Sequence, residues 1–101
     1  MTDATGIKVK LHTILTFKEI LGARETEISL PEGATLKGLL SRINELRGDR
    51  LSLHLFQPGT DRLLPRITLM INGRSIQFLN GLETMLRDGD EVLLLPPVAG
   101  G

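Results

Sequence analysis

The sequence predicts an α+β domain in which one helix crosses one face of a mixed β-sheet. Three observations support this fold class. Several short segments alternate apolar and polar residues as strands do, one longer segment has the period of a helix, and turn residues separate them. Since a single amphipathic helix covers only one face of the sheet, we expect the other face to meet water or a partner.

The N-terminal half is predicted to contain two strands. Residues 7–11 alternate strictly, and residues 25–30 repeat the pattern with a shorter apolar set. Between them, residues 17–21 are expected to form a short helical turn that Gly22 closes, because glycine adopts the left-handed conformation common at helix ends.

Residues 35–47 form the strongest predicted helix. The apolar positions follow an i, i+3, i+4, i+7 rhythm: Leu36, Leu39, Leu40, Ile43 and Leu46. Thr35 is a suitable N-cap and Gly48 a suitable end. Gly38 lies inside the helix, where glycine costs about 1 kcal/mol relative to alanine. We therefore expect the helix to pack closely on the sheet at this position.

The C-terminal half is predicted to add two or three strands. Residues 49–66 are interpreted as a loop with one edge strand, because prolines interrupt an alternation of leucines. Residues 67–71 alternate and precede Asn-Gly, which is typical of a two-residue hairpin and predicts a returning strand over 74–78. Residues 79–86 are expected to contain a single turn. Residues 91–95 are apolar on both faces, which indicates a central strand.

The open face of the sheet is a candidate binding surface. If residues 67, 69 and 71 point toward the helix, Met70 points away from it, and alternation in the last strand places Leu93 and Leu95 on the same side. An exposed apolar patch marks an interaction site, so these three residues are predicted to contact a partner. Coverage of Leu93 and Leu95 by segment 49–66 is an equally acceptable alternative.

Composition excludes several classes of function. Twelve basic residues balance twelve acidic ones, so no global field would hold nucleic acid or an anionic membrane. The absence of cysteine excludes disulfides, thiolate metal sites and a catalytic thiol. Without a signal-peptide pattern or an apolar run of membrane-spanning length, the chain is expected to be one cytoplasmic domain over residues 1–101.

Familiar catalytic constellations are also missing from the sequence. His12 and His54 have neither cysteine partners nor metal-ligand spacing, so structural roles are expected and no metal site is predicted. The acids Asp88, Asp90 and Glu91 cluster in a turn, where solvated carboxylates are common; pairing with a basic partner is the alternative. We therefore expect no catalysis by the chain alone.

The C-terminal segment, Pro-Pro-Val-Ala-Gly-Gly over 96–101, is the most distinctive feature. Proline prevents continuation of the last strand, and glycine admits close approach where a side chain would clash. Six extended residues reach about 20 Å, so the terminal carboxylate is able to enter a narrow site on another protein. A frayed terminus is the alternative. Adenylation by ATP would turn this carboxylate into an acyl donor toward sulfide or an amine.

Two segments carry a resemblance to a known family: FLNGLETMLRDGDEV at 78–92 and LPPVAGG at 95–101. They resemble the small, sulfur-carrying subunit of molybdopterin synthase, a MoaD-like and ThiS-like family, in its archaeal-type branch. The resemblance covers nearly the whole chain and implies a ubiquitin-like β-grasp fold with a flexible Gly-Gly tail. It also implies that no cofactor is bound and that the reactive group is a C-terminal thiocarboxylate, or a transient adenylate, on Gly101.

The resemblance implies roles and partners as well. Gly101 would carry the reacting carbonyl, Gly100 would provide clearance, and the arm that enters the partner would be Pro96, Pro97, Val98 and Ala99. The implied partners are an adenylating enzyme of the ubiquitin-activating (MoeB-like) type, a sulfur donor, and the large (MoaE-like) synthase subunit. Sulfur would pass to a pyranopterin precursor of the molybdenum or tungsten cofactor.

Other functions share the same activated glycine. Related carriers serve thiamine, cysteine or tRNA thiolation, and the two prolines favour the molybdopterin branch over these. A protein modifier would instead be joined through Gly101 to lysines of other proteins. A plain interaction module with an incidental tail is a third alternative, which predicts that deletion of Gly101 leaves function intact.

Overall fold

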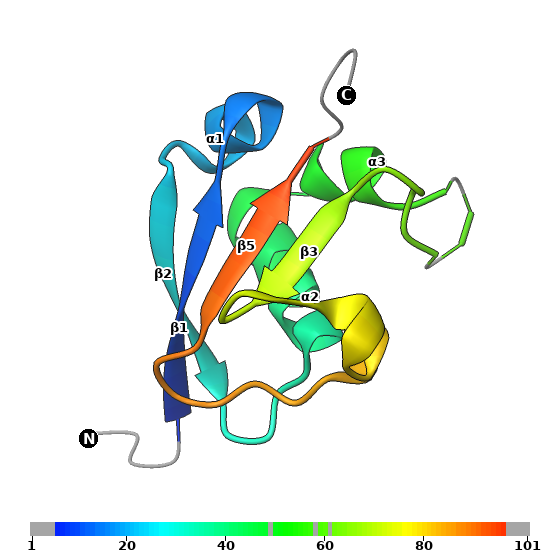
Figure 1. The fold of residues 1–101 in the computed structure, drawn as a ribbon. Coiled ribbons are helices and arrows are strands. Elements are labelled where there is room, and N and C mark those ends of the chain that lie inside the picture. The colour runs from blue at the N-terminus through cyan, green and yellow to red at the C-terminus, as the bar shows by residue number, and fades with distance from the viewer. Residues whose placement is uncertain (1–5, 49, 58, 61, 97–101) are drawn as a thin grey trace.

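The computed structural model describes residues 6–48, 50–57, 59–60 and 62–96. A five-stranded sheet lies in front of the helices in Figure 1, with the strand order β2-β1-β5-β3-β4. The strands are β1 (Gly6–Thr13), β2 (Glu25–Pro31), β3 (Thr68–Ile71), β4 (Arg74–Ser75) and β5 (Glu91–Leu95). β1 and β5 are parallel and the other pairs antiparallel, so the predicted α+β class with a mixed sheet is confirmed.

Among the described residues, three α-helices and two short 3₁₀ helices lie between the strands. They are α1 (Leu15–Leu21), α2 (Leu36–Arg47), α3 (Arg50–Leu55), η1 (Ile76–Phe78) and η2 (Gly81–Glu83). The turn predicted near 17–21 is α1, and Gly22 ends it with a φ of 85°. Within the described ranges, none of the helices combines the length and the apolar character that crossing a bilayer requires.

Helix α2 lies behind the sheet and buries most of the predicted stripe (Figure 1). Thr35 caps it by accepting a hydrogen bond from the Gly38 N–H at 3.3 Å. Two expectations were wrong. Leu46 is 53% exposed. No close contact with the sheet accounts for Gly38, because a Cβ added there would meet only Ala34 and Thr35, at 3.8 Å each.

The predicted hairpin is present, but its second strand is shorter than expected. Asn72 and Gly73 have φ values of 50° and 86°, the two positive angles that a type I′ turn requires. Only Arg74–Ser75 pairs back onto β3, and Ile76–Phe78 turns away as a 3₁₀ helix. The prediction of a strand over 74–78 was wrong because Ile76 is buried in the core, which takes the chain off the sheet edge.

Segment 49–66 differs most from its prediction. Residues 50–55 are helical, so Leu51 and Leu55, one turn apart, are buried while Leu53 is 72% exposed. The expected edge strand is reduced to an isolated bridge between Phe56 and Leu63. Helix α3 packs against α2 and α1, on the helix side of the sheet. This helix therefore leaves the open face uncovered.

Candidate functional site

Strand β5 anchors the start of the C-terminal tail. It is the central strand, as predicted, and pairs with β1 on one side and β3 on the other. Val92, Leu94 and Pro96 alternate toward the helices and are buried, so the last described residue belongs to the core. The predicted site residues beyond it lie outside the described residues: Pro97, Val98, Ala99, Gly100 and Gly101.

The open face of β5 and β3 brings together the three predicted partner-contact residues. Met70 pairs directly with Leu93, and Leu95 pairs with Thr68. All three apolar side chains point away from the helices and are half-buried. Their placement on the open face is confirmed, and their contact with a partner stays a prediction.

Ile14, which the sequence pattern did not predict as part of the face, extends this surface. The parallel register aligns Thr13 with Leu94, so the extended backbone of Ile14 continues beside Leu95. Ile14 is 38% and Leu15 55% exposed. Continued alternation of β1 would have revealed Ile14, because its side chain must oppose that of buried Thr13. We call the set Ile14, Met70, Leu93 and Leu95 the apolar face.

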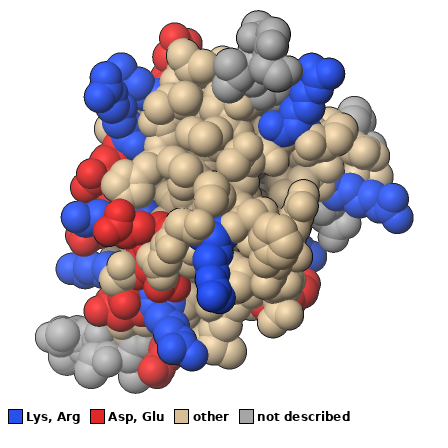
Figure 2. All heavy atoms as spheres, in the orientation of Figure 1, with Lys and Arg blue, Asp and Glu red and all other residues tan. Residues whose placement is uncertain are grey.

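The other half of the same sheet face is charged. Lys10 Nζ lies 3.5 Å from a Glu25 carboxylate oxygen, and His12 Nε2 lies 3.1 Å from Glu91 Oε1. His12 Nδ1 is also 3.8 Å from Glu25. Figure 2 shows mixed red and blue atoms over β1 and β2 beside a largely tan surface over β5 and β3. The open face therefore divides into a charged half and an apolar half.

The clustered acids before β5 stabilise a turn. Asp88 Oδ1 accepts a hydrogen bond from the Lys8 N–H, and Asp90 Oδ2 accepts one from the Arg87 N–H, both at 2.8 Å. Asp90 Oδ1 also accepts from the Asn72 side-chain amide at 2.9 Å. These contacts lie at the start of β5, at the opposite end of the strand from the tail. These hydrogen bonds explain the positions of Asp88 and Asp90, so no partner protein is needed to explain them.

The described residues contain an exposed apolar surface and no cluster of metal-ligand side chains. Among the described residues, no group of three or more histidine, aspartate or glutamate side chains is arranged so that it could hold a metal ion. His54 is exposed in α3, far along the sequence from His12 and on a different element. What remains is an apolar face beside the strand that leads into the C-terminal glycines.

Solved structures of other proteins share this architecture. A small archaeal modifier protein 1 from Methanosarcina acetivorans superimposes with a TM-score of 0.78 and 32% identity, covering 95% of this chain and 98% of its own. A chain in the Amycolatopsis orientalis BexX/CysO complex gives a TM-score of 0.75 and 26% identity, covering 92% and 99%. The predicted ubiquitin-like β-grasp fold is thereby confirmed.

Sequence comparison identifies the family. The model of the ThiS family matches residues 15–101, and the chain belongs to that family. Small archaeal modifier protein 3 of Haloferax volcanii is 33% identical over 95 residues, 94% of this chain and the whole of that protein. The molybdopterin synthase sulfur carrier subunit of Chlamydomonas reinhardtii is 25% identical over 95 residues, with the same coverage.

The predicted resemblance is therefore confirmed at the level of the family, which comprises sulfur carriers and ubiquitin-like modifiers. One relative belongs to a complex with BexX and another is a synthase subunit, so members of this family work with partner proteins.

Proposed function

We propose that this chain is a sulfur carrier whose C-terminal thiocarboxylate donates sulfur in molybdopterin biosynthesis. The observation that carries the proposal is the position of the apolar face, which surrounds the end of β5 where the Pro-Pro-Val-Ala-Gly-Gly segment begins. A partner that binds this face would therefore lie next to Pro96, where the tail begins. The proposal includes a cytoplasmic location and no bound cofactor.

The chemistry takes place on Gly101. Its carboxylate oxygen attacks the α-phosphorus of ATP, which forms an acyl-adenylate and releases pyrophosphate. Sulfide supplied by a donor then attacks the carbonyl carbon, and the C–O bond to AMP breaks, which releases AMP and yields the thiocarboxylate. Gly100 leaves room beside the reacting carbonyl because it has no side chain. We assign the acid and base of these steps to the partner enzymes.

The roles of the remaining residues follow from their order along the chain. Pro96 ties the tail to the core, and Pro97, Val98 and Ala99 form the arm that carries Gly101 into the partner. The apolar face docks first on a MoeB-like adenylating enzyme and then on a MoaE-like large subunit. The relative named as a molybdopterin synthase carrier subunit, which aligns over 94% of this chain, supports this destination.

Protein modification is the second candidate function. The relative named small archaeal modifier protein 3 is 33% identical to this chain, over 94% of this chain and the whole of its own length. This similarity favours the modifier function. In this case the acyl group on Gly101 would pass to a lysine amine and form an isopeptide bond. Carriers for thiamine, cysteine or tRNA thiolation remain further alternatives within the carrier class.

The test is the intact mass of the chain after incubation with ATP, a MoeB-like enzyme and a sulfide source. We expect a gain equal to the replacement of one oxygen by sulfur, absent from a variant that lacks Gly101. The truncated variant should keep the melting temperature of the full chain. No mass change, with the same enzyme active on its own carrier, would contradict the carrier proposal.

The destination needs a second measurement. Thiocarboxylated chain mixed with a MoaE-like subunit and the cyclic pyranopterin precursor should return to its original mass as sulfur is consumed. If sulfur stays on the chain in that mixture while lysates accumulate isopeptides ending in Gly101, the modifier function is the correct one.

A further inference from the structure

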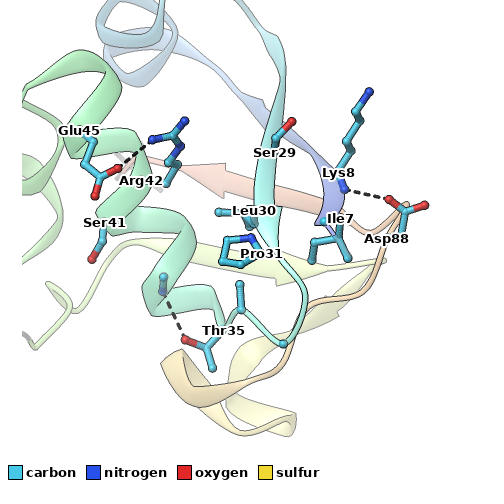
Figure 3. A pocket seen from close by; sticks show the side chains of 14 residues that line it. Ile7, Lys8, Ser29, Leu30, Pro31, Thr35, Ser41, Arg42, Glu45 and Asp88 are labelled. Carbon is cyan, nitrogen blue, oxygen red and sulfur yellow. Dashed lines mark hydrogen bonds and ion pairs between the residues drawn. The ribbon is translucent and has the colours of Figure 1, made fainter. Parts of the chain in front are cut away.

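We infer that the groove between the edge of β2 and helix α2 binds an extended, basic peptide segment of a partner protein, which adds a strand to the sheet. This site lies away from the apolar face and does not depend on the tail chemistry. Strand β2 forms one edge of the described sheet, and the groove beside it has a volume of about 1100 Å³. Figure 3 shows Leu30 and Pro31 of β2 across the groove from Ser41, Arg42 and Glu45 of α2.

The free edge of β2 offers main-chain hydrogen-bonding groups. The Thr13 N–H donates to Arg24 C=O at 2.8 Å, which sets the phase of the antiparallel ladder between β1 and β2. Because inward and outward groups alternate, the N–H and C=O of Glu25, Glu27 and Ser29 point toward the free edge. Such an edge accepts an added peptide strand through main-chain bonds. Pro31, which lacks an N–H, ends it.

Gly38 gives independent support for a ligand in the groove. Gly38 is the third residue of α2, and no described residue requires the missing Cβ there, since an added one meets only ordinary contacts at 3.8 Å. Gly38 lines the groove, where the absent side chain keeps the helix surface open. A glycine that internal packing does not require is explained if another chain approaches the helix there.

Charge decides which peptide fits. Glu25 and Glu27 are exposed on the open-face side of the edge, where alternate side chains of an added strand would lie. Glu25 already contacts Lys10 and His12, so lysine or arginine on the added strand would pair mainly with Glu27. A second copy of β2 would instead bring glutamate against glutamate, which disfavours self-pairing at this edge.

The residues that line the groove determine which side chains the ligand can place inside it. Ile7, Leu30, Pro31 and Ala34 give its floor an apolar character, while Arg42 and Glu45 on its wall neutralise each other through an ion pair at 2.8 Å. Side chains that enter the groove should therefore be small and apolar. The expected ligand alternates basic residues with residues such as valine, and valine also favours the extended backbone.

The experiment titrates the ¹⁵N-labelled full chain with a blocked seven-residue peptide of alternating lysine and valine. We expect amide shifts at Glu27, Ser29, Gly38 and Ser41. A matched peptide with glutamate in place of lysine should bind about tenfold more weakly, since each cross-strand ion pair becomes a repulsion. No shifts with the lysine peptide, or shifts confined to the apolar face, would overturn the inference.

Two variants separate binding from folding. Gly38→Leu should fill the groove and abolish the shifts without lowering the melting temperature, because leucine is the better helix former. Arg47→Leu, on the same helix but outside the groove, is the control and should bind as the original chain does. Binding by Gly38→Leu with unchanged affinity would overturn the inference.

Charge reversal tests the preference for basic peptides. Glu27→Lys should bind the glutamate peptide better than the lysine peptide, whereas Glu83→Lys, in η2 and away from the β2 edge, should keep the original order. An unchanged order in Glu27→Lys would refute the role of charge. Gly38→Leu should still accept sulfur at Gly101, so failure of this inference is distinguishable from failure of the proposed function.

Discussion

The two halves of the open sheet face have the same backbone geometry and different surfaces. On β1 and β2 the outward positions are charged, and Lys10, His12 and Glu25 form ion pairs at 3.5 and 3.8 Å. On β3 and β5 the outward positions are apolar, with Met70 paired directly to Leu93. The tail begins in the apolar half. The difference supports the proposal that the partner that receives the tail binds the apolar half.

Energetics explain why both halves are tolerated. Exposed ion pairs contribute little to stability, typically under about 1 kcal/mol, so the charged half adds little to the free energy of folding. Leaving Leu93, Leu95 and Met70 half-buried gives up hydrophobic stabilisation of roughly 25 cal/mol for each exposed Å² of apolar surface. Such a surface is explained if a partner covers it during function.

The largest expected effect contrasts the two faces of β5. Leu94→Ala should destabilise the fold by about 2–5 kcal/mol, because it opens a cavity among fully buried side chains. Leu93→Ala removes a half-buried side chain and should cost under roughly 1.5 kcal/mol. Urea unfolding of both variants measures the difference. Equal losses would show that Leu93 belongs to the core and not to the open face.

The next effect concerns the partner. Leu93→Glu places a charge in the middle of the apolar face and should raise KM for the adenylating enzyme at least about tenfold while the chain stays folded. Lys10→Glu is the matched change on the charged half and should leave KM within about twofold, because rim charges contribute little. Steady-state pyrophosphate release measures both. Similar KM increases would mean that the partner covers the whole sheet face.

A smaller effect is expected where the apolar face meets α1. Leu15 has a φ of 55°, a conformation that costs an L-residue about 1–2 kcal/mol. Leu15→Gly removes this strain but adds backbone entropy to the unfolded chain, so stability should stay equal or rise by up to about 1 kcal/mol. Glu19→Gly in the same helix should lose about 0.5 kcal/mol. Thermal unfolding that shows equal losses would mean that Leu15 is unstrained.

The smallest effect tests the charged half. Lys10→Ala breaks the ion pair with Glu25, whose two side chains are about half exposed, so the loss should be below about 0.5 kcal/mol. A double-mutant cycle with Glu25→Ala isolates the pair, and added salt should reduce the coupling further. A coupling above about 1 kcal/mol would show that the charged half holds the sheet together.

Local patterns in the sequence predicted most of the strands. Alternation found β1, β2 and β3, because successive side chains of a strand must point to opposite faces, and a continuous apolar run found β5. The Asn-Gly pair at 72–73 predicted the hairpin turn, since both residues tolerate a positive φ. The same alternation placed Met70 and Leu93 on the open face, and its extension by one residue would have added Ile14.

Segment 50–55 shows where such reasoning fails. Leu51, Leu53 and Leu55 alternate in sequence like a strand, yet a helix buries Leu51 and Leu55 against its neighbours and exposes Leu53. Short apolar runs fit both periods, so only the packing partners decide between them. The groove beside Gly38 was equally hidden, because it forms between elements far apart in the sequence.

The sequence by itself determined the strand and helix periods and the hairpin turn, because each depends on neighbouring residues alone. Tertiary structure decided which apolar residues are covered and which elements share a surface. It turned 50–55 into α3, exposed Leu46, and joined Ile14 to Leu95 through the parallel pairing of β1 and β5. Burial and strand neighbours are properties of the packed chain, since they depend on contacts between distant residues.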